Sequence, residues 1–298
     1  NGYQKLFHEV IPQSLESLLS KEKNRYWPSS PSIGWGRKES LLQGDSHYWG
    51  VWWGMEPFEK YKKKVGRFMS EYGFQGMPNV ETFSKFTNSD NFNLNSDAVK
   101  AHQKHNTGYQ TIQTYMERDY KVPTKFEKYI YVSQLLQAEG MKTAIEAHRR
   151  AKPYCMGTLF WQLNDCWPVT SWSSVDYFGN WKAFQYQAKR SFENILISVN
   201  EEENKYTIYI VNDELISKKE KLELQLIDFD GKNLWNTNSE INVEANSSMS
   251  YFQIDKKEFE KFNLKQAVLN LKFNEAVTNF YFVKPKDLEL KTPTISIK

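Results

Sequence analysis

The segment that best indicates the architecture of the chain is M-S-E-Y-G-F-Q-G-M-P, residues 69–78. Aromatic and apolar residues surround Glu71, so residues 67–74 are predicted to form a largely buried strand. A carboxylate in such a strand is costly to desolvate unless contacts offset the cost. Two interpretations stay open from the residues alone. In the first, Glu71 is a surface glutamate at a frayed helix end or a salt-bridge partner of Arg67. In the second, it is a carboxylate at the carboxyl end of a parallel strand, where parallel-sheet enzymes carry their chemistry.

Strand-like and helix-like segments alternate on both sides of this run, up to about residue 190. Strands are predicted at 25–29, 47–54, 67–74 and 155–163, and helices at 3–20, 57–65, 80–86, 96–119, from Pro123 onward, and at 183–192. Continuous apolar strands separated by helices are typical of a parallel sheet covered by helices. A complete eight-fold barrel takes about 250 residues, so we expect a half barrel or an open sheet.

The pattern changes after about Ser191, where apolar and polar residues alternate in short runs such as 206–210 and 222–226. Asp230-Gly231 is a hairpin turn signal. About seven short strands within roughly 100 residues are typical of an immunoglobulin-like sandwich. We therefore predict an α/β plus all-β chain: the carboxyl-terminal half of a (β/α)8 barrel over 1–190, then an immunoglobulin-like β-sandwich over 191–298.

Charge and composition exclude several classes of protein. The net charge of the 298 residues is only +3, and the basic residues are scattered, so no nucleic-acid partner is expected. No apolar run approaches the roughly 18 residues of a membrane-spanning helix. Cys155 and Cys166 lie in apolar surroundings, which predicts two reduced core thiols. His102 and His105 lack an acidic or thiol neighbour, so no metal site is expected.

Tryptophan is the unusual residue of the composition. Nine of the ten tryptophans lie at or before Trp181. Their flat rings suit the apolar faces of sugars, but they also suit an ordinary core. One group falls in F-W-Q-L-N-D-C-W-P, residues 160–168, where Trp161, Asp165 and Trp167 either close the end of a core or form a sugar platform with polar groups beside it.

A second group falls in G-D-S-H-Y-W-G-V-W-W-G, residues 44–54, which also contains His47. Side chains alternate across a strand. If this segment is a strand, Trp49 and Trp53 share one face and Trp52 takes the other, so these three rings cannot all line one pocket.

Four motifs together resemble the β-mannosidases of glycoside hydrolase family 2. They are G-D-S-H-Y-W-G-V-W-W-G at 44–54, S-E-Y-G-F-Q-G-M-P at 70–78, G-T-L-F-W-Q-L-N-D-C-W-P at 157–168 and S-V-D-Y-F-G-N-W-K-A-F-Q-Y-Q-A-K-R at 174–190. They occur in the family's order and cover most of residues 1–190. The resemblance favours the catalytic interpretation of Glu71.

The resemblance implies a retaining exo-hydrolase that removes terminal β-linked mannose and needs no cofactor. Glu71 matches the nucleophile, and Trp161 matches a tryptophan of the mannose site. Trp53 falls where the family has a site aromatic, often tyrosine, and Trp35 matches an aromatic near the leaving group. Asp165 and His47 belong to the motifs and are carried over as substrate-site residues.

The family's acid/base glutamate follows an asparagine, and no such Asn-Glu pair precedes residue 71 here. We therefore expect a carboxyl-terminal fragment that lacks the acid/base residue and is inactive alone. A half barrel also leaves open edges, so we expect self-association through the exposed face or cover from rearranged segments. For the parent protein we favour a periplasmic, secreted or lysosomal location over the cytoplasm.

Other activities stay open. β-Galactosidase and β-glucuronidase belong to the same superfamily, and Asn180-Trp181-Lys182 superficially resembles the Asn-x-Lys element that glucuronidases use for a sugar carboxylate. A different class is a non-catalytic carbohydrate-binding module, with Trp35, Trp53 and Trp161 as its platform.

Overall fold

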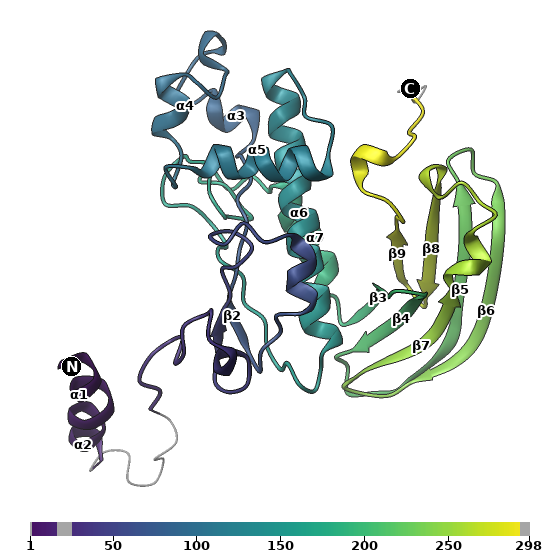
Figure 1. Cartoon of the computed structure of the whole chain (residues 1–298), viewed down its shortest axis with the longest axis horizontal. Helices are drawn as coiled ribbons and strands as arrows, with labels where there is room; N and C mark the ends of the chain where they lie inside the picture. The colour runs from purple at the N-terminus through teal and green to yellow at the C-terminus, as the bar shows by residue number, and fades with distance from the viewer. Residues whose placement is uncertain (1, 17–25, 293–298) are drawn as a thin grey trace.

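The computed structural model describes residues 2–16 and 26–292, in which an α/β part is followed by a β-sandwich (Figure 1). The chain begins with α1 (Gly2–Lys5), a π-helical turn (Leu6–Val10) and α2 (Ile11–Leu15), none of which has a buried residue. The helix predicted at 3–20 is therefore confirmed up to residue 15, and residues 17–20 lie outside the described part. Arg25 also lies outside it, and residues 26–29 form no strand, contrary to prediction.

Two short parallel strands form the centre of the α/β part. β1 (Ser46–His47) pairs with β2 (Met69–Glu71), with His47 opposite Glu71, and Met69 forms a parallel bridge to Thr158. The predicted strands at 67–74 and 155–163 are thus present in much shortened form. Of the four strands predicted for this part, only three contribute to the parallel pairing. The half barrel therefore stays a prediction.

The strand predicted at 47–54 is wrong beyond its first residue. Residues 50–53 form a turn, in which the Trp53 amide donates to the carbonyl of Trp49 at 2.8 Å. Gly54 lets this turn close tightly, because a Cβ there would lie 2.6 Å from the Gly50 carbonyl oxygen. The alternation argument for the three tryptophans therefore does not apply.

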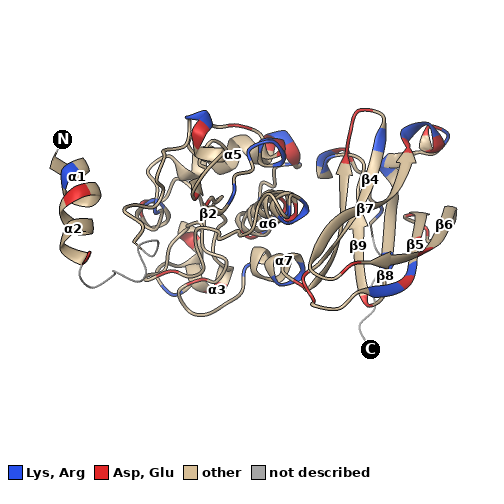
Figure 2. Cartoon of the chain, turned by 90° about the horizontal axis from the view of Figure 1, so that it is seen from below, with Lys and Arg blue, Asp and Glu red and all other residues tan. Residues whose placement is uncertain are grey.

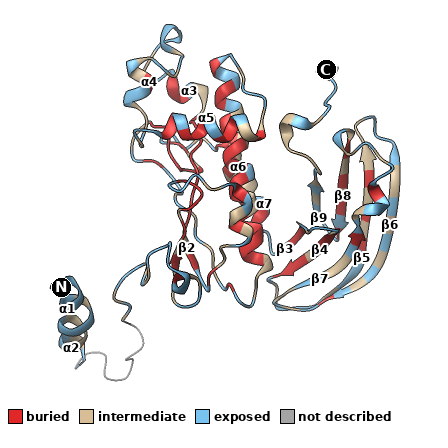
Figure 3. Ribbon diagram, in the orientation of Figure 1, coloured by how far each residue is buried: buried red, intermediate tan, exposed pale blue. Residues whose placement is uncertain are grey.

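Helices cover the strands. They are α3 (Val80–Phe83), α4 (Asp97–Ala101), α5 (Gly108–Asp119), α6 (Phe126–Arg150) and α7 (Ala183–Ser191), with 3-10 turns at Lys38–Leu41, Phe58–Lys62 and Ser89–Asn91. The helices predicted after Pro123 and at 183–192 are confirmed. The segment 80–86 is helical only to Phe83, 96–119 is divided into α4 and α5 by a non-helical stretch at 102–107, and 57–65 forms only the 3-10 turn. Ser96 caps α4 by accepting from the Val99 amide at 3.3 Å. The long α6 packs against α7 and has a largely buried face (Figure 3).

In the described part of the sandwich, residues 191–292, there are seven antiparallel strands, as predicted. They are β3 (Ile195–Glu201), β4 (Lys205–Asn212), β5 (Lys218–Asp228), β6 (Asn233–Val243), β7 (Ser247–Asp255), β8 (Ala267–Phe273) and β9 (Ala276–Phe280). One sheet has the order β3-β4-β7 and the other β6-β5-β8-β9. Leu222, Leu224 and Leu226 of β5 are fully buried between the sheets, and Gly231 forms the β5–β6 turn at φ +84.

The surface fits the sequence expectations in part. Lys and Arg, and likewise Asp and Glu, are scattered over both parts of the chain (Figure 2). Within the described ranges, no helix has both the length and the apolar character needed to cross a membrane. Cys155 is buried as predicted, but Cys166 is exposed, so the prediction of two core thiols is wrong for Cys166. Cys166 lies in the loop that leads to Pro168, away from the apolar contacts of the preceding strand-like segment.

Candidate active site

The carboxylate of Glu71 lies at the end of β2 and is held by two donors. Oε2 is 2.9 Å from Nδ1 of His47 and accepts a hydrogen bond of 2.9 Å from Nε1 of Trp49. The Glu71 side chain is 20% exposed, and that of His47 is 19% exposed. The carboxylate therefore has polar contacts that offset part of its desolvation, while solvent still reaches it. The sequence interpretation of a surface pair with Arg67 has no support, because Arg67 lies over the ring of Tyr154 instead.

A second carboxylate lies behind His47. Asp45 Oδ2 accepts from the hydroxyls of Ser30 and Ser70, each at 2.6 Å, and Oδ1 accepts from Nε1 of Trp27 at 3.3 Å. Burial raises the pKa of Asp45, but these hydrogen bonds outweigh burial and hold the pKa below its usual range. Asp45 is thus a stable anion, 3.8 Å from Nε2 of His47.

Trp161 lies beside the end of β2. Its backbone amide donates to the carbonyl of Tyr72 at 2.8 Å, and 44% of the residue is exposed. Gly73 permits this approach, because a Cβ there would collide with the Trp161 carbonyl oxygen and press on the rings of Trp49 and Trp172. The exposed Trp161 ring and the Glu71 carboxylate therefore belong to neighbouring strand ends.

Trp53 and Trp35 are also exposed, at 53% and 39%. The Trp53 ring packs edge-on against His105, with centroids 4.5 Å apart. The Trp35 ring packs edge-on against Tyr48, with centroids 6.3 Å apart. Both rings leave surface free for a ligand, and Tyr48 follows His47 directly in the chain.

Asp165 has a different setting. Its carboxylate is buried and accepts from the hydroxyls of Ser173 at 2.6 Å and Ser171 at 2.9 Å. None of these partners contacts Glu71 or His47 among the hydrogen bonds of the described residues. Asp165 therefore fixes the loop that follows Trp161, and its direct contact with a sugar stays a prediction.

Lys182, from the Asn-x-Lys element, is fully buried. Its ammonium donates to the carbonyls of Gly76 at 2.9 Å and Ser171 at 3.3 Å. Burial lowers the pKa of Lys182 to about 8, although Asp165 and Asp176 oppose the shift. An ammonium held this way cannot reach a sugar carboxylate, which argues against the glucuronidase alternative.

The structure thus brings Glu71 and His47 into contact and places the backbone of Trp161 beside the end of β2, while Trp35, Trp53 and Asp165 make separate contacts. Sequence reasoning missed the roles of Asp45, Ser30 and Trp49. The available signal was the position of Asp45 and Trp49, each two residues from His47 and within the same motif at 44–54.

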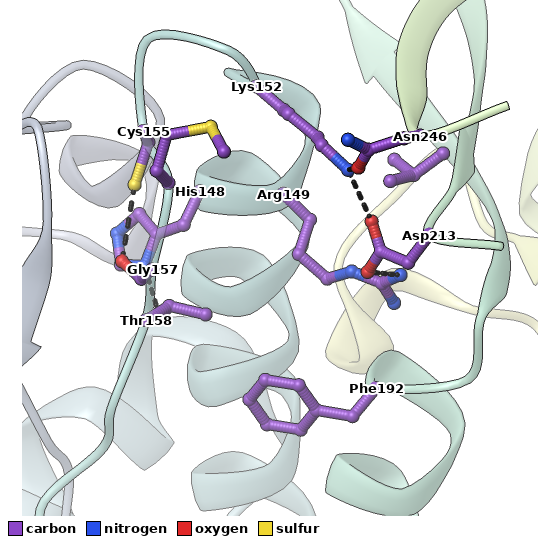
Figure 4. Close-up of a pocket in the computed structure, with 11 residues that line it drawn as sticks. His148, Arg149, Lys152, Cys155, Gly157, Thr158, Phe192, Asp213 and Asn246 are labelled. Atoms are coloured by element: carbon purple, nitrogen blue, oxygen red, sulfur yellow. Dashed lines mark hydrogen bonds and ion pairs between the residues drawn. The ribbon is translucent and has the colours of Figure 1, made fainter. Parts of the chain in front are cut away.

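The α/β part and the sandwich enclose a junction cavity of about 360 Å³ (Figure 4). Asp213 of the sandwich pairs across it with Arg149 at 2.9 Å and Lys152 at 2.8 Å. His148 and Cys155 line its other side. Glu71 is not among its lining residues, so this cavity is distinct from the candidate active site.

A carboxylate at a parallel strand end with exposed tryptophans nearby fits the class of glycoside hydrolases. The profile of the Mannosidase Ig/CBM-like domain matches residues 204–287. Beta-mannosidase B of Emericella nidulans is 31% identical over 243 residues, covering 74% of this chain and 28% of that protein. Beta-mannosidase B of Aspergillus terreus is 33% identical over 220 residues, covering 70% of this chain and 26% of that protein. The chain is a homologue of the β-mannosidases of glycoside hydrolase family 2.

Solved structures also show this similarity to β-mannosidases. The Beta-D-Mannosidase from Dictyoglomus thermophilum aligns with a TM-score of 0.88 and 33% identity, covering 96% of this chain and 36% of that one. The exo-chitosanase CsxA of Amycolatopsis orientalis aligns with a TM-score of 0.64 at 15% identity, covering 82% of this chain and 30% of that one, which shows a shared fold alone. The chain thus spans only about a third or less of the length of these relatives.

Proposed function

We propose that this chain supplies the nucleophile and part of the sugar site of a retaining exo-β-mannosidase that removes terminal β-linked mannose. The observation that carries the proposal is the Glu71 carboxylate, one-fifth exposed at the end of β2 and held at 2.9 Å by both His47 and Trp49. The substrate is a β-mannoside or a mannose-terminated oligosaccharide. Trp161, Trp53 and Trp35 form its aromatic contacts.

In the proposed reaction, Glu71 attacks the anomeric carbon while the bond from that carbon to the leaving oxygen breaks. An acid gives its proton to the leaving oxygen and then takes one from the water that hydrolyses the glycosyl-enzyme. Retaining enzymes hold these two carboxyl groups about 5–5.5 Å apart. Asp45 is unsuited to be the acid, because its lowered pKa keeps it ionised.

We therefore propose that the acid comes from a part of the protein outside this chain. That is consistent with the chain's covering 28% of the Emericella nidulans relative and 36% of the Dictyoglomus thermophilum one. Hydrolysis of an aryl β-mannoside by this chain alone is then negligible. If this chain alone hydrolyses the substrate at a normal enzymatic rate, and Glu71→Gln abolishes that activity, the chain must contain the acid and the proposal is wrong.

The nucleophile can be tested without the acid. Fluoride leaves without protonation, so a 2-deoxy-2-fluoro-β-mannosyl fluoride needs only a nucleophile to form the covalent adduct. We expect intact-mass analysis to find one added fluoromannosyl group and peptide mapping to place it on Glu71. Glu71→Gln abolishes labelling, while Glu81→Gln, a matched change at an exposed carboxylate on α3, leaves it unchanged. Labelling at another residue, or none at all, would reject Glu71.

A non-catalytic carbohydrate-binding role is the second candidate, favoured by the three exposed tryptophans. Titration with mannose, followed by tryptophan fluorescence, separates the two. Binding that persists without any covalent labelling indicates a binding module. Comparing aryl mannoside, galactoside and glucuronide on the full-length protein tests the sugar preference, with the mannoside expected to react fastest.

A further inference from the structure

The hydrogen bonds behind Glu71 fix the protonation of a histidine. The residues concerned are Ser30, Asp45, His47, Trp49 and Glu71, which we call the His47 cluster. His47 lies at its centre, with one ring nitrogen toward each carboxylate. Because a neutral imidazole has one donor and one acceptor nitrogen, while the imidazolium has two donors, the partners of the two nitrogens decide its state.

Nε2 faces an acceptor. Its nearest partner is the Ser30 oxygen, at 3.0 Å. Ser30 has a single hydroxyl proton, and this proton goes to Asp45 Oδ2, only 2.6 Å away. Asp45 is ionised, since its hydrogen bonds hold its pKa low, and so it can only accept. The Ser30 oxygen therefore offers a lone pair to Nε2, and Nε2 carries a proton.

Nδ1 also faces an acceptor. It lies 2.9 Å from Glu71 Oε2, the oxygen that already accepts from the Trp49 indole at 2.9 Å. An indole nitrogen only donates, so Oε2 acts as an acceptor in this arrangement. Oε2 of Glu71 therefore accepts from both the Trp49 indole and Nδ1 of His47. Nδ1, like Nε2, carries a proton.

We propose that His47 is a positioning residue held as a doubly protonated imidazolium between Glu71 and Asp45, which orients the Glu71 carboxylate. Its catalytic meaning rests on the proposed function of Glu71. Among the described residues, the charged groups in contact with His47 are Glu71 of β2 and Asp45 of the loop before β1, and both are acidic.

The cluster also has a defined response to alkali. When Nε2 loses its proton, the Ser30 hydroxyl can turn to donate to Nε2, and Asp45 keeps its bonds from Ser70 and Trp27. Nδ1 still donates to Glu71, but the positive charge beside the carboxylate is gone.

The protonation state is measurable without any catalytic activity. In the whole chain labelled with 15N-histidine, long-range 1H–15N spectra report both ring nitrogens of each of the five histidines, and His47→Asn assigns the signals. At pH 7 we expect both nitrogens of His47 to have shifts of the protonated type. Asp45→Asn abolishes this signature at pH 7, while Asp90→Asn, a matched change in an exposed turn, leaves it.

A wild-type His47 with one unprotonated nitrogen at pH 7 would overturn the proposal. This test uses only the wild-type chain, so it does not depend on whether the Asp45→Asn variant folds. A His47 signal that Asp45→Asn leaves unchanged would overturn the role of Asp45. The positioning role has its own readout, the rate of Glu71 labelling by the fluoromannosyl fluoride. We expect His47→Gln to slow labelling about tenfold or more, with His8→Gln, a change at an exposed histidine of the amino-terminal helix, as the control.

These outcomes separate the two proposals. If the wild-type chain is not labelled at all but His47 is doubly protonated, the proposed nucleophile fails and the assignment of His47 stands. If labelling occurs on Glu71 at the same rate and pH dependence in His47→Gln, the nucleophile stands and the positioning role fails.

Discussion

The hydrogen bond from Trp49 to Glu71 can be removed by a single substitution, which tests how the candidate nucleophile is held. Trp49→Phe keeps an aromatic ring against Trp172 but removes the indole donor to Oε2. A hydrogen bond to a charged group contributes about 1.5–3 kcal/mol. We expect the remaining contact with His47 to hold the carboxylate less firmly and the labelling of Glu71 to slow by about tenfold or more. The rate is measured by intact mass over time.

Trp181→Phe provides the matched control, because Trp181 is 40% exposed and packs on Tyr186. It should label at the wild-type rate. Equal rates for Trp49→Phe and wild type would show that the Trp49 hydrogen bond does not orient the nucleophile.

His148 couples the stability of the fold to pH. Burial, reinforced by Arg150, lowers the pKa of His148 to about 3, against about 6.5 in an unfolded chain. The unfolded state therefore binds more protons between these values, so the contribution of His148 is complete above pH 6.5 and is lost as the pH falls toward 3. His148→Gln should reduce the acid dependence of the free energy of unfolding by up to about 1.4 kcal/mol per pH unit.

Urea unfolding at several values between pH 7 and pH 4 measures this slope. His8→Gln, on the exposed face of the amino-terminal helix, is the control and should leave the slope unchanged. An unaltered slope in His148→Gln would mean that the histidine is not neutral in the fold.

At the scale of single residues, the sequence motifs alone nominated Glu71 and Trp161 as site residues, because each lies within its own motif, and both roles stay predictions. The partners of Glu71 were harder to predict. Ser30 and Asp45 reach His47 through loops, and contacts between loops depend on turns that no residue periodicity encodes. For the same reason, Asp165 could be selected by its motif but not recognised as a buried partner of two serines.

At the scale of elements, β2 depends on Gly73, which lets the chain of Trp161 pass close to it. Gly73→Ala forces Trp161 away from the strand end, since the new methyl group would occupy the space of its carbonyl oxygen. Overpacking of this kind costs typically about 1–3 kcal/mol. We expect urea unfolding to show that loss and Glu71 labelling to slow as well, because the neighbouring Trp49 ring is also displaced.

Gly34→Ala is the comparison for that experiment, because a Cβ at Gly34 meets no atom within 4 Å. It should leave both measurements unchanged. A Gly73→Ala chain with wild-type stability and labelling would show that Trp161 can move without consequence for the site.

Periodicity predicted the elements best where many residues share one pattern. The apolar spacing after Pro123 became α6, and the alternation in 222–226 became the buried face of β5. It failed at 48–54, where aromatic residues of high strand propensity form a turn between two glycines. There the packing of Trp52 against Phe74 and Trp172 overrides the local preference for an extended chain.

At the scale of the whole molecule, the sandwich is tied to α6 by charges. Asp213 pairs with Arg149 and Lys152. Burial raises the pKa of Asp213, but the hydrogen bond from Lys152 and the charge of Arg149 outweigh this effect and hold the pKa below its usual range. The Arg150 guanidinium also donates to Ser198 at 2.5 Å. The carboxyl end of α6 therefore positions the sandwich, while the candidate site lies at β2.

One edge of the α/β part is open and should drive self-association. Within the described part of the chain, the amides of Met156, Leu159 and Trp161 bond to the β2 segment, whereas those of Thr158 and Phe160 donate to no backbone carbonyl. Met156 and Leu159 are also exposed, at 58% and 56%. An unpaired strand edge with apolar side chains is a template for pairing with a second chain.

We expect light scattering to give a mass that rises above that of one 35.2 kDa chain as the concentration increases. Leu159→Lys places a charge on this edge and should shift the equilibrium toward the monomer, because edge lysines oppose strand pairing. Leu215→Lys is the control, since Leu215 is 85% exposed on the sandwich. A monomeric mass at all concentrations, or equal association in the two lysine variants, would contradict pairing through this edge.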